Sequence, residues 1–587
     1  MIIMDAKEEI PRISKKLGKL NEIFNIRAIS YAVILLNLVS FVLGIVYLTS
    51  MSYYTVIWDI FGVLYLITLF GNFLLVYVDS IRVNKADRIG NRISMIGYIY
   101  LAFMVLSMGA MFMGNFLYSV TYPPELVANL GAFILIYLGF FGGLIFGLLV
   151  GYINLKNYEK TEIWDTTKFR KTNRGRKLLK YILMAFCYLI LLVGVYFAAI
   201  TLFGADLGYI SGAIGMFVAQ LDLFFVFITL SVTIFLLKLK DRKLSPKSYY
   251  GVAIVGLVLS GIFMAPLCST QFAINAAETN FSAAFGSNWR DKIPTEVATQ
   301  YFLQTPFSTP VYFLGMVSNN YRVNANILFY DAEGIQLYFD AYLPPVDGST
   351  LPGNNSVIIR IHGGGWTQGD KGLANMMQMN KYFAAQGYVV FDIQYGLHDD
   401  GAAILPTPAH VLGNFTVDDM MRHIGNFTKY LADHASEYNA NLDSVFISGG
   451  SAGGHLTCAV GLAITSGNYS DIFGDGLNIK GLVPYYPANG HPERFGGREE
   501  FINPDQYLVT ASSPPSLVFQ GYEDGLVHPI ISQNLKDAYI EAENPNCAVL
   551  FFPFAGHAAD LYFTGHYNQV FLYYMERFLY LCVNDYI

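Results

Sequence analysis

Long apolar runs fill the first half of the chain, and few occur in the second half. A bilayer takes about 20 apolar residues per helix, and seven runs are long enough to be predicted as membrane spans. They cover residues 28–49, 54–78, 93–117, 126–152, 178–203, 212–237 and 249–270. Pro266 and neighbouring polar residues are expected to end the seventh run early. The pattern predicts an all-α, polytopic membrane domain over residues 28–274.

After a predicted connector over residues 275–326, the pattern changes to short strands that alternate with helices. A hairpin is predicted from 327–330 and 336–342, turning at Ala332-Glu333-Gly334. Further strands are expected at 357–361, 388–393, 444–448, 482–486, 516–520 and 548–553, and helices near 372–386, 417–436 and 453–465. Elements of these lengths in alternation predict a mostly parallel sheet covered on both faces. The region 327–587 is therefore predicted to be one α/β domain.

Basic residues alternate between the loops of the predicted membrane domain. Lys and Arg occur in the tail 1–27 and in the second, fourth and sixth loops, whereas the first, third and fifth loops have none. Basic loops stay in the cytoplasm, so the chain is predicted to be a multi-pass cell-membrane protein with its N-terminus inside and its C-terminal domain outside. The tail has apolar residues at helical spacing among its lysines. It is interpreted either as a helix on the inner membrane surface or as an unordered basic tail.

Charge and cysteine content narrow the classes of function. The part from residue 275 onward has 13 Lys and Arg against 30 Asp and Glu, a net charge of −17, while the rest carries 24 basic and 14 acidic residues. A strongly acidic globular region argues against nucleic acid as a partner. Five cysteines are too few for a disulfide scaffold, although Cys547 and Cys582 are candidates for one bond. Cys458 is expected in the core.

Asp222 is the one acidic residue that falls well inside a predicted span, the sixth. A carboxylate at that depth is costly, so it is a functional candidate. Two structural explanations are favoured over that hypothesis. Either Asp222 is neutral and bonded to a neighbouring helix, or the span begins later than predicted.

Two glycine motifs carry the predicted chemistry. Gly449–Gly454 contains a G-x-S-x-G sequence, in which a sharp turn from strand to helix exposes a serine, here Ser451. His362–Trp366 is a glycine-rich loop of the kind that supplies backbone N–H groups to an oxyanion. Ser451 is the predicted nucleophile. The predicted oxyanion-hole donors are the backbone N–H groups of Ala452, Gly363, Gly364 and Gly365.

A serine nucleophile needs a base and an orienting carboxylate, in the chain order Ser, Asp or Glu, His. His557 follows the last predicted strand directly, and Asp524 follows the strand before it, so these are the predicted base and acid. Glu523 competes for the role of the acid. Three nearby candidates are interpreted as rim or structural residues, or as pointing into the fold: His455, His528 and Asp560.

From about residue 327 to 582 the chain resembles the α/β-hydrolase fold, and within it the hormone-sensitive-lipase-like and arylacetamide-deacetylase-like carboxylesterases. The residues that carry this resemblance are His362–Trp366, Gly449–His455, Pro514-Pro515, Gly521–Asp524 and Gly556-His557. The resemblance implies hydrolysis of a carboxylic ester, a lipid-like ester included, through an acyl-enzyme and without metal or cofactor. It names no function for the seven spans.

The segment 487–511 is expected to cover the substrate pocket. Its polar residues His491, Arg494 and Arg498 either meet an anionic substrate or are simply solvated. Two rival functions stay open beside the esterase. An acyltransferase would use the same triad with a lipid or glycan acceptor, and a membrane sensor or transporter would keep the hydrolase fold only as a binding domain.

Overall fold

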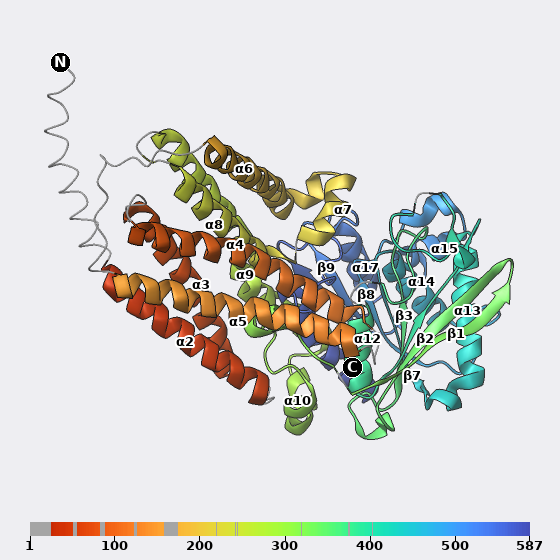
Figure 1. Cartoon of the computed structure of the whole chain (residues 1–587). Coiled ribbons are helices and arrows are strands. Elements are labelled where there is room, and N and C mark those ends of the chain that lie inside the picture. Colours follow the sequence, from red (N-terminus) through yellow and green to blue (C-terminus); the bar gives the residue numbers. More distant parts are fainter. Residues whose placement is uncertain are drawn as a thin grey trace, which may run out of the picture. The chain divides into compact units, whose positions relative to one another are not determined.

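The structure is a computed structural model that describes most of the chain (Figure 1). The described residues are 25–50, 56–82, 88–121, 126–157, 174–218, 220–240, 242, 245–318, 320–373, 376–401 and 403–587. The predicted membrane-surface helix in the tail lies almost wholly outside them, as do Lys85 of the second loop and half of the basic residues of the fourth. The chain divides into two compact units. The first comprises residues 1–112, 135–195 and 224–261, and the second comprises 113–134, 196–223 and 262–587.

Seven helices among the described residues are long and apolar enough to cross a membrane. They are α2 (Ile26–Ser50), α3 (Val56–Arg82), α4 (Arg88–Ser119), α5 (Leu126–Asn157), α6 (Arg174–Phe203), α8 (Asp222–Leu239) and α9 (Pro246–Phe285). The seven predicted apolar runs each match one of these helices, so a multi-pass membrane domain is confirmed as the class of the N-terminal region.

Two of the predicted spans have the wrong limits. The sixth run divides into a short helix, α7 (Tyr209–Val218), and α8, which begins at Asp222. Asp222 is therefore the first residue of the span, as the second structural explanation proposed, and not deep inside it. The seventh span does not end near Pro266 but continues as one helix to Phe285. Membrane helices tolerate an internal proline, although Pro266 has no N–H for the carbonyl oxygen of Ile262 one turn earlier.

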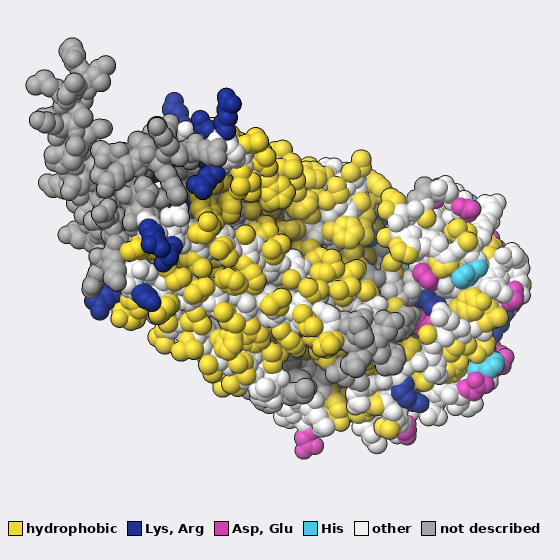
Figure 2. Space-filling model, in the orientation of Figure 1, with side chains coloured by type: hydrophobic (Ala, Val, Ile, Leu, Met, Phe, Trp, Pro, Cys, Tyr) yellow, Lys and Arg dark blue, Asp and Glu magenta, His cyan; other side chains and the backbone are white. Residues whose placement is uncertain are grey.

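In the first unit, α2 turns large apolar side chains outward and buries small polar ones. On α2, Ser30, Asn37 and Ser40 are buried, whereas Leu35 is 61% exposed. Asn37 Nδ2 donates to Asn72 Oδ1 of α3 at 2.7 Å, and Asn72 Nδ2 donates back to Asn37 Oδ1 at 3.1 Å. Figure 2 shows the hydrophobic side chains covering the visible face of these helices almost continuously. A surface of this kind is stable only against lipid tails.

The second unit is built on an eight-stranded sheet of order β1-β2-β4-β3-β7-β8-β9-β10. The strands are β1 (Arg322–Ala332), β2 (Ile335–Leu343), β3 (Ser356–Ile361), β4 (Val389–Ile393), β7 (Asn441–Gly450), β8 (Ile479–Tyr485), β9 (Ser516–Gly521) and β10 (Cys547–Phe552). Only β1–β2 and β2–β4 are antiparallel. The hairpin turns at Glu333-Gly334, both at positive φ, which suits a two-residue turn. A short pair, β5 (Leu397–His398) and β6 (Leu412–Gly413), lies apart from this sheet.

Helices cover both faces of the sheet, as predicted. The longer ones in this unit are α12 (Met376–Ala385), α13 (Val417–His434), α14 (Ala452–Ser466), α17 (Ile530–Glu541) and α18 (His566–Val583). The shorter ones, besides α7, are α10 (Thr295–Tyr301), α11 (Thr309–Leu314), α15 (Glu499–Ile502) and α16 (Pro504–Tyr507). On one face, α13 and α14 pack on β3 and β4. On the other, Phe571 of α18 lies 5.2 Å from Phe519 between ring centroids.

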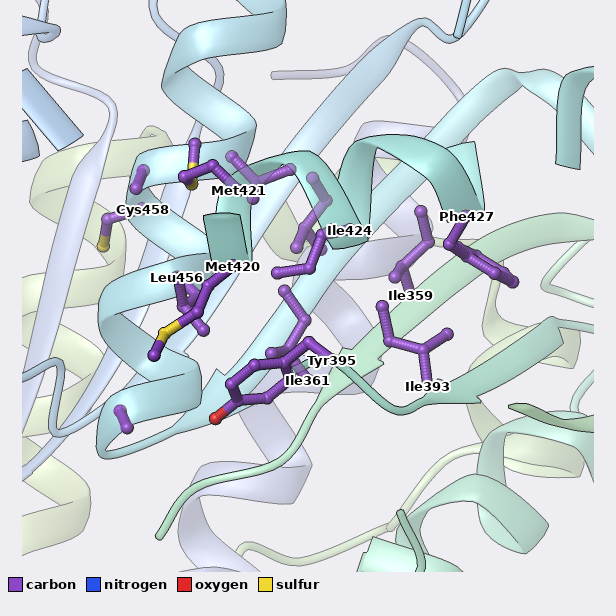
Figure 3. Packing of buried hydrophobic residues seen from close by; sticks show 14 of the residues in the cluster. Ile359, Ile361, Ile393, Tyr395, Met420, Met421, Ile424, Phe427, Leu456 and Cys458 are labelled. Atoms are coloured by element: carbon purple, nitrogen blue, oxygen red, sulfur yellow. The ribbon is translucent and has the colours of Figure 1, made fainter. Parts of the chain in front are cut away.

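A continuous apolar core lies under α13 and α14 (Figure 3). Ile359 and Ile361 of β3 point toward Met420, Ile424 and their neighbours on α13. Each of these side chains is buried, and full burial of one stabilises the fold by about 1.5–3 kcal/mol. α13 begins with a capping box, in which Thr416 and Asp419 exchange hydrogen bonds. This packing fixes the carboxyl ends of β3 and β7, where the two glycine motifs lie.

One end of several of these helices belongs to the second unit, and the end of α4 bonds to other parts of that unit. Asn115 Nδ2, near the end of α4, donates to the carbonyl oxygen of Phe313 at 3.1 Å. Lys381 Nζ of α12 donates to the carbonyl oxygen of Tyr118 at 3.1 Å and also contacts that of Thr121. A buried ammonium at the C-terminus of a helix satisfies carbonyls that have no partner within the helix. The sheet is thus packed together, within the second unit, with helix ends that sequence reasoning had assigned to the membrane domain.

Candidate active site

Ser451 occupies the turn between β7 and α14 in a strained backbone conformation. Its φ is 59° and its ψ is −120°, a region that costs a non-glycine residue of the order of 1–3 kcal/mol. Hydrogen bonds hold this conformation from both sides. Ser451 N–H donates to the carbonyl oxygen of Tyr485 at 3.0 Å, and the Ser451 carbonyl accepts from the N–H of His455 at 3.0 Å. The predicted sharp turn from strand to helix is therefore present.

The glycines around Ser451 are required by close backbone approach. A Cβ on Gly453 would run into the carbonyl oxygen of Ile361, at the end of β3. A Cβ on Gly454 would lie 2.5 Å from the carbonyl oxygen of Tyr485, at the end of β8. Because real Cβ atoms do not approach backbone this closely, only glycine lets the first turn of α14 enter between the two strands. The N-terminus of α14, with its favourable dipole for negative charge, lies directly after the Ser451 side chain.

The glycine loop after β3 lies against the serine turn. A Cβ on Gly363 would be 2.7 Å from the carbonyl oxygen of Gly450 and 3.3 Å from Ser451 Cβ. Gly364 and Gly365 have positive φ values of 119° and 63°, so their N–H groups do not continue the hydrogen-bond pattern of a strand or a helix. Among the described residues, the N–H groups of Gly363, Gly364, Gly365 and Ala452 have no hydrogen-bond acceptor. Donors that lack a partner beside a serine are suited to an oxyanion.

His362 fixes the shape of this loop. Its Nδ1 lies 2.8 Å from the carbonyl oxygen of Gly363, and its own carbonyl accepts from the hydroxyl of Tyr395 at 3.0 Å. The imidazole stacks on the Tyr395 ring with centroids 4.6 Å apart. Burial lowers the pKa of His362, so the ring is held in its neutral form.

Asp524 and His557 form a buried pair after neighbouring strands. Asp524 follows β9 and His557 follows β10, and Asp524 Oδ2 lies 2.8 Å from His557 Nδ1. Asp524 Oδ1 accepts from the N–H groups of Leu526 at 2.9 Å and Val527 at 2.8 Å. These bonds aim the carboxylate at the imidazole and leave His557 Nε2 on the opposite side of the ring. Such a pair orients a histidine as a base.

Tyr486 connects the serine turn with the Asp–His pair, and sequence reasoning missed it. Its ring centroid lies 4.5 Å from that of His557, and its hydroxyl would be 2.9 Å from a Cβ on Gly450, the residue before Ser451. The hydroxyl donates to Asp560 Oδ1 at 2.6 Å. Tyr486 follows β8 at a φ of 35°. A tyrosine directly after a parallel strand, at the same edge as the two motifs, is the only signal in the sequence for this position.

The structure separates the competing candidates from this arrangement. Glu523 points away from His557, and its Oε2 accepts from the N–H of Ala205 at 3.5 Å. His455 is fully buried between Trp366 Nε1 and the carbonyl oxygen of Phe501, and burial lowers its pKa to about 4. His528 is exposed and accepts from the N–H of Ile530. Asp560 accepts the hydrogen bond from Tyr486, which agrees with its interpretation from sequence as a structural residue.

The predicted covering segment forms short helical turns that place one of its three polar residues near the pair. Burial lowers the pKa of His491, and two neighbours affect it too: Asp524 raises it and His557 lowers it. Arg498 does not extend toward a substrate but pairs with Asp418, with Nε 3.3 Å from Oδ2. Arg494 lies over the Phe495 ring.

The five cysteines are free thiols. Cys547 and Cys582 are both buried free thiols, so the candidate disulfide between them is absent. Cys458 is buried in the core, as expected. Within the described ranges, no group of three or more His, Cys, Asp or Glu side chains is arranged to hold a metal ion.

The strand order and mostly parallel sheet are those of an α/β-hydrolase, and the C-terminal domain resembles the ester-hydrolysing members of that class. The family model described as BD-FAE matches residues 339–480. The chain is 26% identical over 235 residues to the probable carboxylic ester hydrolase LipM of Mycobacterium tuberculosis, which covers 36% of this chain and 51% of LipM. It is 22% identical over 312 residues to esterase LipQ of the same organism, in a match that covers 49% of this chain and 70% of LipQ. The match thus spans about half the length of LipM.

Solved structures of two esterases are also similar to the domain. Esterase 2 of Thermogutta terrifontis, phosphorylated by paraoxon, aligns with a TM-score of 0.33 and 22% identity over 41% of this chain and 85% of its own. Esterase B of Lactobacillus rhamnosis, inhibited by a tributyrin phosphonate, aligns with a TM-score of 0.37 and 20% identity over 46% of this chain and 89% of its own.

Proposed function

We propose that this protein is a membrane-anchored serine carboxylic ester hydrolase, with Ser451 as nucleophile, His557 as base and Asp524 as the orienting acid. The observation that carries the proposal is the strained turn at Ser451, which has N–H groups without acceptors on one side and a buried Asp–His pair nearby. A strained serine at a sharp turn is costly for the fold and useful for catalysis. The similarity to LipM and LipQ supports the same reaction class.

In the acylation half-reaction, Ser451 Oγ attacks the ester carbonyl carbon while His557 Nε2 takes its proton. Asp524 holds the imidazole by Nδ1 and stabilises the imidazolium that forms. The carbonyl oxygen becomes negative and is bound by the N–H groups of Ala452 and Gly363, with Gly364 and Gly365 as further donors. The carbon–oxygen bond to the alcohol then breaks. His557 gives its proton to the leaving alkoxide, and the acyl group stays on Ser451.

Deacylation repeats these steps with water as the nucleophile. His557 takes a proton from water, the hydroxide attacks the acyl carbonyl, and the collapse of the second oxyanion returns the proton to Ser451 Oγ. The products are a carboxylic acid and the free enzyme. No group other than the named side chains and backbone donors takes part in the proposed steps.

The hydrolase domain is proposed to face the outside of the cell, since the basic loops alternate with loops that have no Lys or Arg. A tag added after Ile587 is expected to bind antibody on intact cells. A tag that binds only after the cells are permeabilised contradicts this orientation.

Replacing Ser451 by Ala tests the proposal directly. The full-length Ser451→Ala protein is expected to lose hydrolysis of p-nitrophenyl acetate by a factor of about 10⁴ or more and to lose labelling by a fluorophosphonate. Ser466→Ala is the matched control, because Ser466 lies at the far end of the same helix, where its hydroxyl bonds to the carbonyl oxygen of Ala463 and the N–H of Asn468. Labelling that survives in Ser451→Ala contradicts the assignment.

The same design separates the base from its competitors. His557→Ala is expected to abolish turnover, whereas His528→Ala, which removes an exposed histidine, is expected to retain it. Product analysis with lipid and glycan acceptors then decides whether water or another hydroxyl takes the acyl group. Recovery of an acylated acceptor in place of the free acid contradicts simple hydrolysis.

A further inference from the structure

The loop that carries the proposed acid rests on the segment between the fifth and sixth spans. We call this segment, residues 204–218 and 220–222, the α6–α8 connection. A Cβ on Gly212 of the connection would lie 2.8 Å from the carbonyl carbon of Gly525, the residue after Asp524. A Cβ on Gly204 would lie 2.5 Å from the carbonyl oxygen of Glu523. The two backbones are thus in direct contact on both sides of Asp524.

The loop that carries the proposed base rests on the same connection. The N–H of Tyr562, five residues after His557, donates to Gln220 Oε1 at 2.5 Å. Tyr312 Oη donates to the carbonyl oxygen of Gln220 at 2.9 Å, and Tyr562 Oη donates to the carbonyl oxygen of Tyr312 at 2.6 Å. His566 Nδ1 lies 3.5 Å from Asp222 Oδ1. One short segment therefore supports both members of the Asp–His pair.

The chain itself places this connection at the membrane surface. It joins the end of α6 to the start of α8, and both helices are long and apolar enough to be spans. From Leu207 to Leu221 it contains no charged residue. A segment of about 15 residues between two spans, with a ten-residue apolar helix in it, cannot leave the interface for bulk water without exposing that helix.

The surface of the connection is apolar where it is exposed. In α7, Tyr209 and Ile210 are 75% and 74% exposed. The large exposed apolar residues of the α6 end and the connection are Phe203, Leu207, Tyr209, Ile210 and Phe217. In Figure 1, α7 lies beside β9 and α17, the elements that border the acid loop. This is the surface of a membrane-interface helix, and it occurs within the compact unit that holds the proposed site.

We propose that the substrate is a membrane-resident ester, held in the leaflet at the α6–α8 connection, whose acyl chain reaches Ser451 along α7. The inference rests on the proposed ester hydrolysis. The physical reason is the cost of extraction, since lifting a fatty acyl chain into water costs about 0.8 kcal/mol per CH₂. A site whose acid and base loops rest on an interfacial apolar helix takes the carbonyl at the depth where lipid esters lie. The chain then stays in an apolar environment throughout.

Two esters and one pair of variants test this inference on the full-length protein in phosphatidylcholine vesicles. The esters are p-nitrophenyl palmitate, which partitions into the bilayer, and p-nitrophenyl acetate, which stays in water. Ile210→Ser/Phe217→Ser makes the exposed face of α7 polar. The control Val346→Ser/Ile404→Ser removes two apolar residues of comparable exposure, 70% and 90%, from loops of the hydrolase domain.

The wild type is expected to prefer the palmitate. The α7 variant is expected to lower the palmitate-to-acetate ratio of kcat/KM by at least about tenfold, or about 1.4 kcal/mol, with acetate hydrolysis within about twofold of wild type. The control is expected to keep the wild-type ratio. An unchanged ratio in the α7 variant, an equal loss on both esters, or a wild type that prefers acetate overturns the inference. Failure of Ser451→Ala to abolish acetate hydrolysis instead overturns the proposed function.

Discussion

In both compact units the apolar side chains face an apolar environment. For α2 of the first unit that environment lies outside the protein, and for the sheet of the second unit it is the core. In the first unit, α2 buries Asn37 and exposes Leu38, which is 50% exposed. In the second, every residue of β3 is buried, and charged residues such as Asp418 lie at the surface. Since lipid tails are as apolar as leucine, packing in the first unit depends on small and polar contacts, whereas the second depends on the hydrophobic effect.

The α6–α8 connection is the exception that makes this comparison informative. It belongs to the second unit by its packing but has the outward apolar surface of the first. A connection with no other function would be expected to carry polar residues in a loop that meets water. Its apolar surface beside the loops that carry Asp524 and His557 is the feature on which the proposed membrane-resident substrate rests.

The largest expected effect is a charge placed in the core of the second unit. Ile359→Asp buries an unpaired carboxylate in the middle of β3 and is expected to cost more than about 4 kcal/mol, enough to abolish the folded hydrolase domain. Fluorescence-detected size exclusion in detergent measures this as loss of the monodisperse peak. Ile359→Val, which removes one methylene, is expected to cost about 0.5–1.5 kcal/mol. A monodisperse, active Ile359→Asp protein would contradict the described core.

The contact between α7 and the acid loop is expected to give the next largest effect. Gly212→Val forces the backbone at Gly525 to move and displaces Asp524, so turnover of p-nitrophenyl acetate is expected to fall by about 10²-fold. Ala213→Val introduces the same side chain at a half-buried neighbouring position and is the matched control, expected to stay near wild type. Equal activity of the two variants would show that the contact does not position the acid.

A buried carboxylate of the second unit, Asp392, is expected to make its stability depend on pH. Burial, and then the neighbouring Asp340, raise the pKa of Asp392 to about 7, although Arg360 and Lys371 oppose this. Between about pH 4 and 7 the folded protein keeps a proton that the unfolded chain releases, so stability falls as the pH rises through this window and is level above it. The loss is expected to be about 2–4 kcal/mol.

Asp392→Asn is expected to flatten this dependence, because an amide retains its acceptor for Gly372 N–H and Asn380 but does not ionise. Thermal unfolding of the full-length protein at pH 5 and pH 7.5 measures it. Asp399→Asn, at an exposed position in the same region, should keep the wild-type slope. An unaltered slope in Asp392→Asn would mean that another group causes the dependence.

The smallest expected effect is in the membrane helices. Asn37→Ala removes both hydrogen bonds to Asn72 and is expected to destabilise the helical unit by about 0.6–1.7 kcal/mol. Leu38→Ala changes the adjacent lipid-facing residue and is expected to have almost no effect, since no packed contact is lost. Thermal denaturation in detergent compares the two. A larger loss for Leu38→Ala would reverse the assignment of inner and outer faces.

Much of the fold was predictable because each signal was local. Spans follow from apolar length, and the serine turn follows from glycines within five residues of each other. Most predicted strands match β1 to β10 within a few residues. Asp524 and His557 were identified by their position after strands, and the structure brings these two side chains into contact. Their catalytic role stays a prediction.

The errors came from features that local pattern does not record. The break before Asp222 lies in an apolar stretch, so hydropathy shows one continuous run. α18 was missed because it is buried almost throughout and has no polar face to reveal its period. Tyr486 belongs to no motif, and its contact with His557 depends on the order of the strands. The contacts of the α6–α8 connection with the loops that carry Asp524 and His557 join segments more than 300 residues apart.

The assignment of Ser451 can be tested most directly by locating a covalent label. The full-length protein in vesicles is treated with a fluorophosphonate and digested, and the modified peptide is sequenced by mass spectrometry. The phosphonate is expected on Ser451 alone, and its attachment should be lost in His557→Ala. A label on any other residue, or no label on an intact protein that still hydrolyses p-nitrophenyl acetate, would contradict the proposed nucleophile.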